Sequence, residues 1–504
     1  MNATRQPARY VIAGAGVAAA MAALALASRL PPSSHSITVL CDGDGAGRNF
    51  GQIVATRPDV RRFHADYAVN EDDLVRAGAA SFTLGTAYSN WSASRPTYFL
   101  PYGDAGAAIG GVAFHLLAAR LGAEGNKIAL ADYSVAAIMA QSGRFARPSD
   151  DPRSVLSTFT YGLHLDAGRY AEALFKLARE RGATVVQDSL RSVETADGRI
   201  EALHLASGER LAGQIFVDAT GTRAALASGL QGGEFERWED LLPFDRVVSA
   251  VTRVGAPPAP YAHVAANSCG WRMTVPAGSV VGEVLVYSSD LLSPEHAERM
   301  LLAKGTGEPI TAPHHAAVIP GSRRPWIGNC IAFGEAAVVA KPLHSVPMTL
   351  LQNGIERLLR LLPADREMEA EATEFNRAAA LEAERARDLA ILPYRLNGQR
   401  GEPLWDRLSE APLSGELERK IGLYSSRGRV PLLDGDMLDE AEWAALFDGH
   451  GVIPERIDVL AKAIPLERLT AQLARMRQIM VQAIAPLPQH GDYLRQLSAK
   501  TVAA

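Results

Sequence analysis

The chain is poor in the residues that would indicate a metal centre or a disulfide scaffold. It has only three cysteines among 504 residues, Cys41, Cys269 and Cys330, and their spacing is not that of metal ligands. The twelve histidines show no metal-binding spacing either. A few cysteines in odd number are typical of a reducing compartment, so we predict a cytoplasmic protein without a metal site.

An excess of charge of one sign is also missing. The net charge is −5, which gives no electrostatic reason to expect nucleic acid or an anionic membrane as partner. Residues 11–30 form the one long hydrophobic run, and it is rich in alanine and begins with glycines. A basic region followed by a cleavage site, as in a signal peptide, is lacking there. We therefore interpret residues 11–30 as part of a nucleotide site.

Residues 10–42 have the pattern of a strand, a glycine turn, a helix and a second strand. In such a turn the first glycine allows the tight backbone, the second lets a pyrophosphate approach, and the third position needs a small residue. The helix N-terminus adds free N–H groups and a partial positive charge. The alternative is an alanine-rich helix after a glycine turn without a ligand. We predict that the dinucleotide contacts are Gly14, Gly16, Val17, Ala18 and Ala19.

Three later positions favour FAD over NAD. Asp42 follows the second strand, where an acid usually binds the adenosine ribose. Val217-Asp218-Ala219-Thr220-Gly221 resembles the ATG segment of the glutathione-reductase-type FAD fold. Gly334-Glu335 resembles the Gly-Asp pair of that fold, which contacts the flavin ribityl and phosphate groups. Because these signals occur in the right order, we predict Asp42, Gly334 and Glu335 as cofactor contacts.

The remaining pattern predicts an α/β protein with an FAD-binding Rossmann-like fold of the glutathione-reductase and flavin-monooxygenase type. A mixed-sheet substrate domain and a helical C-terminal region are expected in addition. We predict a flavin and substrate-cavity module over residues 1–365, in interleaved segments, and a mainly helical region over 366–504. Helices are expected at 107–121, 170–181 and 367–392 and over most of 440–499, and strands at 247–254 and 280–287.

Residues 329–352, NCIAFGEAAVVAKPLHSVPMTLLQ, carry a family resemblance. They resemble the second flavin-contacting motif of the flavin-dependent tryptophan halogenases, N-C-[VI]-A-[LF]-G-x-A-A-x-x-x-x-P-L-E-S-T-[GS]-[IL]-x-L-[IL]-Q. Other segments resemble that family too: SFTLG at 81–85 is similar to T-F-K-L-G, GWRMTVP at 270–276 to W-x-W-x-I-P, and GHGVIP at 449–454 to G-Q-G-x-x-P. The chain is identified as a divergent member of the family.

The resemblance implies a cofactor and partners. In the family, FADH2 from a separate flavin reductase reacts with oxygen, and bound halide is oxidised to hypohalous acid. A lysine polarises the electrophilic halogen, and a glutamate stabilises the charge that develops on the aromatic ring. The resemblance thus implies FAD, a flavin reductase and a small aromatic substrate. A homodimer is a further option for the assembly.

Four chemistry positions of the family carry other residues here. The lysine is replaced by Thr83, which has no charge, and the glutamate by His344, which is not reliably an anion. The halide-binding threonine is replaced by Val346, and the small residue after it by Pro347, which has no N–H. These changes predict that standard tryptophan halogenation is not carried out.

A fifth departure concerns the loop that wraps the flavin. The family motif G-V-G-E-A-T-I-P aligns with GQIVATRP at residues 51–58, where Ile53 replaces a glycine and Val54 a glutamate. A side chain at a glycine position is expected to crowd the flavin. This expectation leaves open whether FAD binds.

The candidate catalytic positions are Thr83 and His344, and the candidate substrate contacts are Trp271, His344 and Ser345. His344 is either a general base or a polar residue that fills an unused tunnel, and Trp271 fits a cavity wall or the core. The pair Arg323-Arg324 either binds an anion or is solvated.

Three functions remain open. The first is an FAD-dependent oxidoreductase of this family that acts on an aromatic or indole-like small molecule, with oxygenation in place of halogenation as one option. The second is an inactive binding or scaffold protein with weak or no flavin binding. The third is halogenation by a rearranged site that uses another lysine. We expect the first, because the ligand-binding frame is kept over most of the chain.

Overall fold

The chain divides into two units, each assembled from three separate segments. The computed structural model describes residues 8–42, 51–126, 128–255, 259–305, 307–340, 342–363, 367–398 and 401–499. The first unit consists of residues 1–80, 165–249 and 314–384, and the second of residues 81–164, 250–313 and 385–504. The predicted division into 1–365 and 366–504 stays a prediction.

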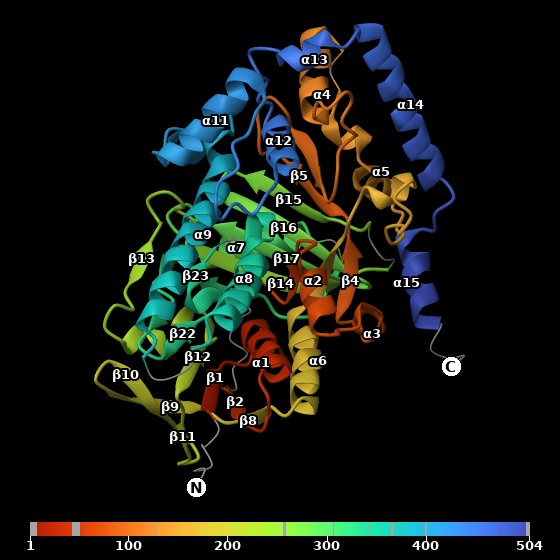
Figure 1. Cartoon of the computed structure of the whole chain (residues 1–504). Helices are drawn as coiled ribbons and strands as arrows, with labels where there is room; N and C mark the ends of the chain where they lie inside the picture. The colour runs from red at the N-terminus through yellow and green to blue at the C-terminus, as the bar shows by residue number, and fades with distance from the viewer. Residues whose placement is uncertain are drawn as a thin grey trace. The chain divides into compact units, whose positions relative to one another are not determined.

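A six-stranded sheet forms the centre of the first unit, in the order β21-β22-β12-β1-β2-β8 (Figure 1). All of its strands are parallel except the edge strand β21. In register, Tyr10 of β1 lies opposite Ile215 of β12 and Ile37 of β2. Parallel strands are covered on both faces, which explains why β12 is buried along its whole length.

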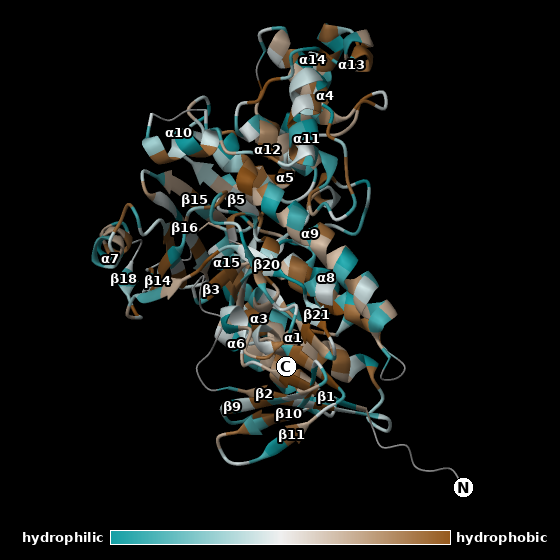
Figure 2. Ribbon diagram, turned by 90° about the vertical axis from the view of Figure 1, so that its left-hand side faces the viewer, coloured by the Kyte–Doolittle hydropathy of each residue, from teal (hydrophilic) through white to brown (hydrophobic). Residues whose placement is uncertain are grey.

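Helix α1 and a small antiparallel sheet cover this central sheet. The helix buries every residue from Ala19 to Ala27, and in Figure 2 it has the brown colour of hydrophobic residues. A helix that is apolar on all sides belongs in a protein interior, so the run at 11–30 is a strand and a buried helix. Residues of the three-stranded sheet β9-β10-β11, such as Ile200 and Leu203, join one apolar cluster with Val11 and Phe216.

The elements of the first unit have the following bounds: β1 (Ala8–Ala13), α1 (Val17–Arg29), β2 (His35–Cys41), β3 (Ile53–Ala55), α2 (Val60–Asp66), α3 (Glu71–Arg76), α6 (Ala167–Glu180), β8 (Thr184–Gln187), β9 (Leu190–Ala196), β10 (Arg199–Leu205), β11 (Arg210–Ala212), β12 (Ile215–Asp218), η3 (Gly221–Arg223), η4 (Ala227–Gly229), β13 (Phe235–Arg237), β19 (His314–Ala317), β20 (Gly321–Arg323), β21 (Trp326–Ile327), β22 (Cys330–Ala332), η5 (Gly334–Ala336), β23 (Val338–Val339), η6 (Pro342–His344) and α8 (Val346–Arg360). β14 (Arg246–Arg253) and α9 (Glu369–Arg395) begin in this unit and continue into the second.

The second unit contains most of a larger, mainly antiparallel sheet. Its strand order is β18-β14-β17-β16-β15-β5-β6. β15 and β5 pair in parallel, and the pairs β18-β14, β17-β16, β16-β15 and β5-β6 are antiparallel. The unit contains β5 (Gly85–Ser89), β6 (Thr97–Pro101), α4 (Phe114–Ala123), η1 (Leu130–Tyr133), α5 (Val135–Gln141), η2 (Val155–Ser157), β15 (Ala262–Asn267), β16 (Gly270–Ala277), β17 (Val280–Tyr287), α7 (Pro294–Ala303), β18 (Glu308–Pro309), α10 (Pro403–Ser409), α11 (Gly415–Arg427), α12 (Glu440–Gly449), α13 (Val459–Ala463), α14 (Leu466–Ile484) and α15 (His490–Ala499); β4 (Ala80–Thr83) and β7 (Gly162–Asp166) lie at its boundary.

The structure confirms the predicted fold class, with a parallel sheet, a mixed second sheet and a helical C-terminal region. One helix prediction was partly wrong, because the helix expected at 107–121 begins only at Phe114. Gly110 and Gly111 have φ of 60° and 76°, and this left-handed backbone does not belong to a right-handed helix. Among the described residues, no helix is long and apolar enough to cross a membrane.

A buried carboxylate closes the turn after β12. Asp218 is fully buried, and its Oδ1 accepts hydrogen bonds from the N–H and the hydroxyl of Thr220 at 3.0 and 2.7 Å. Its Oδ2 accepts the N–H groups of Leu226 and Ala227 at 2.8 and 2.9 Å. Four donors satisfy this carboxylate, which a buried charge requires.

We expect Asp218→Ala to lower the free energy of unfolding by about 3 kcal/mol, because several buried donors lose their acceptor. Thermal unfolding followed by circular dichroism measures the effect. The matched control is Asp240→Ala at an exposed position, which is expected to change stability by less than about 0.5 kcal/mol. Equal melting temperatures for the two variants would contradict this account of the turn.

Candidate functional site

The glycine turn after β1 and the turn after β12 touch through their backbones. Gly14 has a φ of +142°, and a Cβ on this residue would lie 2.3 Å from the carbonyl oxygen of Ala219. The Gly14 N–H donates to the Leu40 carbonyl at 2.9 Å, and the Ala219 N–H donates to the Ala13 carbonyl at 2.8 Å. Only glycine fits at position 14, because any side chain would separate these strands.

Helix α1 begins at this turn, and no side chain caps its N-terminus. Gly16 is the N-cap residue, no side chain caps the helix, and its first turn contains no acidic residue. The N–H groups of Val17, Ala18 and Ala19 belong to the first turn, which has no carbonyl partners within the helix. With the partial positive charge of the helix end, this arrangement suits a pyrophosphate.

The predicted pair Gly334-Glu335 lies against the same helix end. It forms η5 after β22, and a Cβ on Gly334, whose φ is +61°, would lie 3.2 Å from the Cβ of Ala18. The Phe333 N–H donates to the Asp218 carbonyl at 2.8 Å, which ties η5 to the turn after β12. The structure therefore brings together three segments that are far apart in the sequence.

Asp42 lies where the sequence predicts it, at the end of β2. Its Oδ2 forms an ion pair with Arg223 of η3 at 3.0 Å. The sequence does not predict Arg223 as the partner of Asp42, because no local pattern around either residue points to a partner 181 positions away. The neighbouring Cys41 is buried, and burial raises the pKa of its thiol against the opposing effect of Arg179. Asp42 is therefore the acid available at this strand end.

Ile53 does not occupy a backbone conformation that requires glycine. It lies in the short strand β3 with extended backbone, and its side chain is buried. The backbone of Ile53 therefore gives no conformational reason for the expected steric conflict with a flavin. Crowding of a flavin by the Ile53 or Val54 side chain stays a prediction.

The positions that the resemblance assigns to halide binding lie at the start of α8. His344 ends η6 and is buried, and Val346, also buried, is the first residue of α8. Ser345 precedes the helix with a φ of 57°, a left-handed conformation that costs a non-glycine residue about 1 kcal/mol or more. Pro347 is in the first turn and has no N–H. A backbone donor for a halide is therefore missing at residue 347.

In the second unit, Thr83 is fully buried at the end of β4. Its hydroxyl donates to the Gly85 carbonyl at 3.2 Å. A hydroxyl held by the adjacent backbone has neither the charge nor the reach of a lysine amine. Thr83 therefore offers no charged group at the position where the resemblance implies a lysine.

Trp271, the predicted substrate contact, lies inside an aromatic cluster of the second unit. Its indole N–H donates to the Tyr394 hydroxyl at 2.9 Å, and the ring is fully buried. Trp91 lies between Trp271 and Trp405, at ring-centroid distances of 6.3 and 5.5 Å. The indole N–H of Trp271 is thus already used, and its contact with a substrate stays a prediction.

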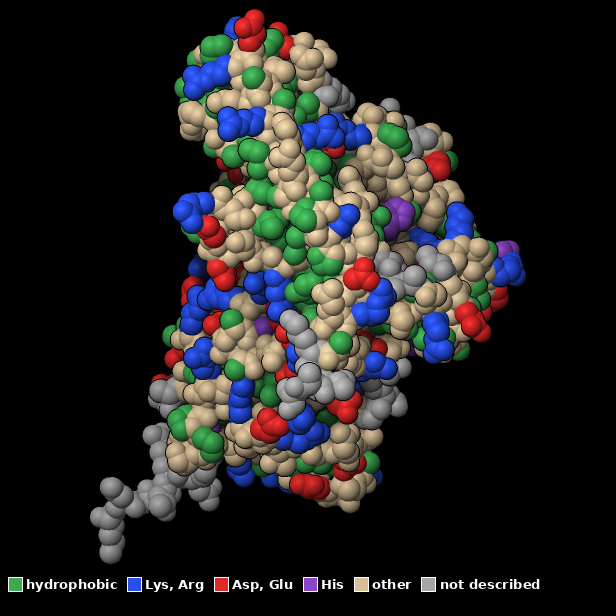
Figure 3. Space-filling model, turned by 90° about the vertical axis from the view of Figure 1, so that its right-hand side faces the viewer, with side chains coloured by type: hydrophobic (Ala, Val, Ile, Leu, Met, Phe, Trp, Pro, Cys, Tyr) green, Lys and Arg blue, Asp and Glu red, His purple; other side chains and the backbone are tan. Residues whose placement is uncertain are grey.

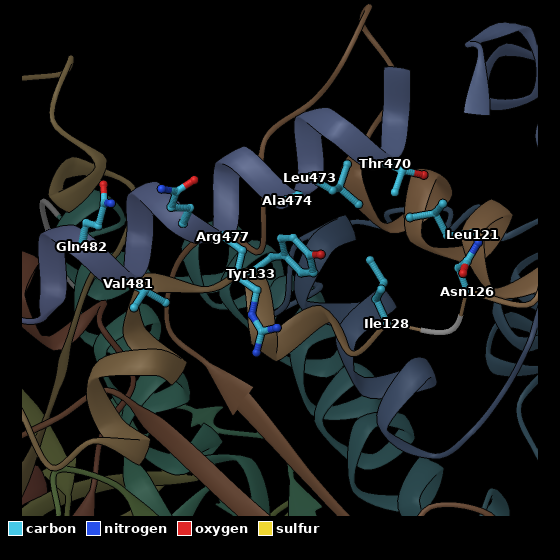
Figure 4. A pocket seen from close by; sticks show the side chains of 11 residues that line it. Leu121, Asn126, Ile128, Tyr133, Thr470, Leu473, Ala474, Arg477, Val481 and Gln482 are labelled. Carbon is cyan, nitrogen blue, oxygen red and sulfur yellow. The ribbon is translucent and has the colours of Figure 1, made fainter. Parts of the chain in front are cut away.

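A groove of about 820 Å³ runs along α14 in the second unit. Leu121, Ile128 and Tyr133 line one side and Leu473, Arg477 and Val481 of α14 the other, as Figure 4 shows. Figure 3, seen from the side where α14 lies in Figure 1, shows hydrophobic side chains between Lys and Arg side chains on this face. None of the predicted site residues lines this groove.

Two buried histidines of the second unit are neutral over most of the pH range. Burial lowers the pKa of His164 from 6.5 to about 3, against a hydrogen bond to the Pro276 carbonyl. Burial likewise lowers the pKa of His450 from 6.5 to about 4. The 2.6 Å contact identifies Nδ1 of His164 as the protonated nitrogen, since a carbonyl oxygen only accepts.

The lowered pKa values of these histidines predict that the protein loses stability on acidification at pH values higher than those at which carboxylates titrate. The unfolded histidines take up protons near pH 6.5, whereas the folded ones stay neutral down to about pH 4, so stability falls as the pH falls through this window. Each histidine contributes about 1.4 kcal/mol per pH unit. Denaturant unfolding between these pH values should show a slope smaller by that amount in His164→Asn. The exposed control His314→Asn should keep the slope of the parent chain.

The glycine turn, the open helix end, Asp42 and η5 define a dinucleotide-binding flavoprotein of the glutathione-reductase type. The residues fit FAD, because Gly14 allows the close backbone approach and the first turn of α1 carries no opposing acid. The protein-family model for tryptophan halogenase matches residues 9–466. The chain belongs to the tryptophan halogenase family, and the predicted FAD is the cofactor of that flavin-dependent family.

Individual relatives support the same assignment. The flavin-dependent halogenase BrvH from Brevundimonas sp. BAL3 is 34% identical, with a TM-score of 0.92 over 98% of this chain and 99% of that one. Xcc4156, a flavin-dependent halogenase from Xanthomonas campestris, is 29% identical, with a TM-score of 0.91 over 98% and 99% of the two chains. The tryptophan 6-halogenase SttH from Streptomyces toxytricini is 26% identical over 89% of this chain and 90% of its own.

Gly14→Ala tests the geometry of the nucleotide turn. We expect it to abolish saturable FAD binding and to lower the melting temperature, because its Cβ would collide with the Ala219 carbonyl. Gly111→Ala is the matched control: Gly111 also has a positive φ, but a Cβ there would meet nothing within 4 Å. The control should cost about 1 kcal/mol in stability and leave FAD binding unchanged. Unchanged FAD binding in Gly14→Ala would refute the assignment of the turn.

Proposed function

We propose that the chain is an FAD-dependent oxidoreductase that oxygenates an aromatic, indole-like small molecule and does not carry out standard halogenation. The observation that carries the proposal is the convergence of the glycine turn, the turn after β12 and η5 at the N-terminus of α1. The changed residues at the family's chemistry positions support the second half of the proposal.

The chain's own residues would hold FAD in an extended arrangement. The turn from Gly14 to Ala19 would bind the pyrophosphate, Asp42 the adenosine ribose, and Gly334-Glu335 the ribityl chain. Reduced FAD, from a separate flavin reductase, would supply the electrons for reaction with oxygen. The three cysteines are buried and unpaired, which fits the cytoplasmic location that we propose.

Loss of the halogenation residues has a large expected effect on that chemistry. Removal of one well-placed donor in an enzyme site costs about 10²- to 10³-fold in rate. Here Thr83 removes a cation, His344 removes a carboxylate and Pro347 removes a backbone donor. These losses together support an enzyme that no longer binds and transfers a halogen.

His344 would serve the aromatic substrate in this proposal. Its imidazole is buried and offers one donor and one acceptor in the neutral form. Such a group suits hydrogen bonding to a ring N–H or hydroxyl, or proton removal during oxygenation. Ser345 and Trp271 are the further substrate contacts that we propose.

A second candidate is a catalytically inactive binding or scaffold protein of the same fold. The changes at Thr83, His344 and Pro347, together with those at Ile53 and Val54, favour it. It differs from the first candidate in a measurable property, since it requires weak or no flavin binding. A homodimer fits either candidate.

Titration with FAD separates the two candidates. We expect saturable binding of oxidised and of photoreduced FAD, with a dissociation constant in the micromolar range or lower. The absorbance and fluorescence of the flavin report the binding. The structural reason is that the pyrophosphate contacts are backbone groups that the side-chain changes leave intact. No binding of either form would exclude the oxidoreductase and leave the binding protein.

A halide assay tests the loss of halogenation. With FAD, NADH, a flavin reductase and chloride or bromide, we expect no halogenated product from a panel of indoles by mass spectrometry. SttH under the same conditions is the positive control on tryptophan. Incorporation of an oxygen atom into one of the indoles, in the presence of flavin, would support the proposed reaction. Any halogenated product would overturn it.

A further inference from the structure

The end of β2 and the end of η3 meet at the carboxyl end of β1. In the central sheet, β1 lies between β2 and β12 and pairs with both (Figure 1). Asp42 follows β2, and Arg223 ends η3, which comes shortly after β12. Their ion pair of 3.0 Å therefore joins the two neighbours of β1, at the strand end from which the turn with Gly14 begins.

Buried hydrogen bonds fix the backbone next to Arg223. The Thr220 hydroxyl donates to Asp218 at 2.7 Å and accepts the Ala225 N–H at 2.7 Å. Ala224, fully buried, has a φ of 42°, a left-handed conformation that is uncommon outside glycine. Such a conformation persists where the surrounding structure holds it in place. The core of the unit thus sets the position from which the Arg223 side chain extends.

The ion pair contributes little to the stability of the fold. The Arg223 side chain is 53% exposed, and that of Asp42 is 13% exposed. An ion pair with an exposed partner gains little, because water screens it and both side chains lose freedom. The location of the pair at the nucleotide frame therefore indicates a role in binding.

The pair uses only one oxygen of Asp42. Nη2 of Arg223 donates to Oδ2, whereas Oδ1 has no donor among the described residues. An acid at the end of the second strand usually accepts hydroxyls of the adenosine ribose. With Oδ2 held by the guanidinium, Oδ1 is the oxygen that remains for the ribose. Arg223 thus orients the acceptor.

The charge of Asp42 is a second reason for a cation at this place. Both phosphates of a dinucleotide carry negative charge, and the helix end binds them close by. An unpaired carboxylate would repel these phosphates, whereas a neutralised pair would not. The first turn of α1 supplies only the partial positive charge of a helix end. Arg223 therefore removes a repulsion that the ribose acceptor would otherwise create.

We propose that Arg223 is a positioning residue of the nucleotide site, which neutralises Asp42 and orients it toward the adenosine ribose of a bound dinucleotide. The proposal deepens the proposed function and rests on it, because it needs the same nucleotide frame. It names the adenosine half of the cofactor as the part that the pair recognises, and it gives Arg223 no part in the oxidation chemistry.

Isothermal titration of the full-length chain with ADP, which contains the adenosine and the pyrophosphate of FAD, tests the pair without a flavin. We expect Arg223→Gln to weaken ADP binding by about tenfold, because Asp42 keeps its charge and loses its cation. Arg210→Gln is the matched control, since Arg210 of β11 forms an exposed ion pair of 2.9 Å with Glu194 in the same unit. The control should bind ADP as the parent chain does.

A second substitution separates positioning from a merely structural role. Asp42→Asn in the Arg223→Gln background removes the charge that Arg223 neutralises, so the double variant should bind ADP at least about threefold more tightly than Arg223→Gln. A side chain that only supports the fold would give no such recovery. The loss in Arg223→Gln should also shrink between about 0.01 M and about 1 M salt, as the Debye length falls from about 30 to about 3 Å.

The same variants are titrated with FAD. Parent-like affinity of Arg223→Gln for both ligands would overturn the proposal, as would a double variant that binds no better than Arg223→Gln. If the parent chain binds neither ADP nor FAD, the nucleotide site and the proposed function fall together. FAD binding by the parent with an unaffected Arg223→Gln would refute only the role of Arg223. Melting temperatures near that of the parent are expected throughout, because the pair is exposed on one side.

Discussion

The Cα of Gly14 approaches the carbonyl oxygen of Ala219 so closely that a Cβ would lie 2.3 Å from it. This contact depends on the parallel pairing of β1 with β12, which brings the ends of both strands to one edge of the sheet. The N-terminus of α1, the end of β2 and η5 take their positions from that edge. The nucleotide frame is thus a consequence of strand register, and a residue that separates β1 from β12 removes all of its parts together.

The frame and the chemistry of this family rest on different kinds of atoms. The frame consists mainly of backbone groups, which side-chain substitutions leave in place as long as the glycines remain. The halogenation chemistry that the resemblance implies rests on individual side chains and on one N–H, each of which a single substitution removes. This difference explains how one chain keeps a flavoprotein frame around Gly14 and Gly334 and yet carries Thr83, His344 and Pro347.

Helix α8 borders two different parts of the first unit. Its start carries Val346 and Pro347 beside η6, where the resemblance predicts the halide-binding residues. Along its length, Leu350 and Gly354 line a cavity of about 370 Å³ that Phe375 and Ala379 of α9 line from the other side. Pro347, in the first turn of α8, lines the same cavity.

The sequence by itself determined the family and the fold class and predicted the three nucleotide segments, because local chemistry encodes them. A glycine with positive φ before an apolar helix, and apolar strands buried on both faces, have signatures within a few residues. Only the tertiary structure decided the partner of Asp42, the extended backbone at Ile53 and the burial of Trp271. Each of these depends on residues far apart in the chain, and their meeting follows from strand register and helix packing that no local pattern records.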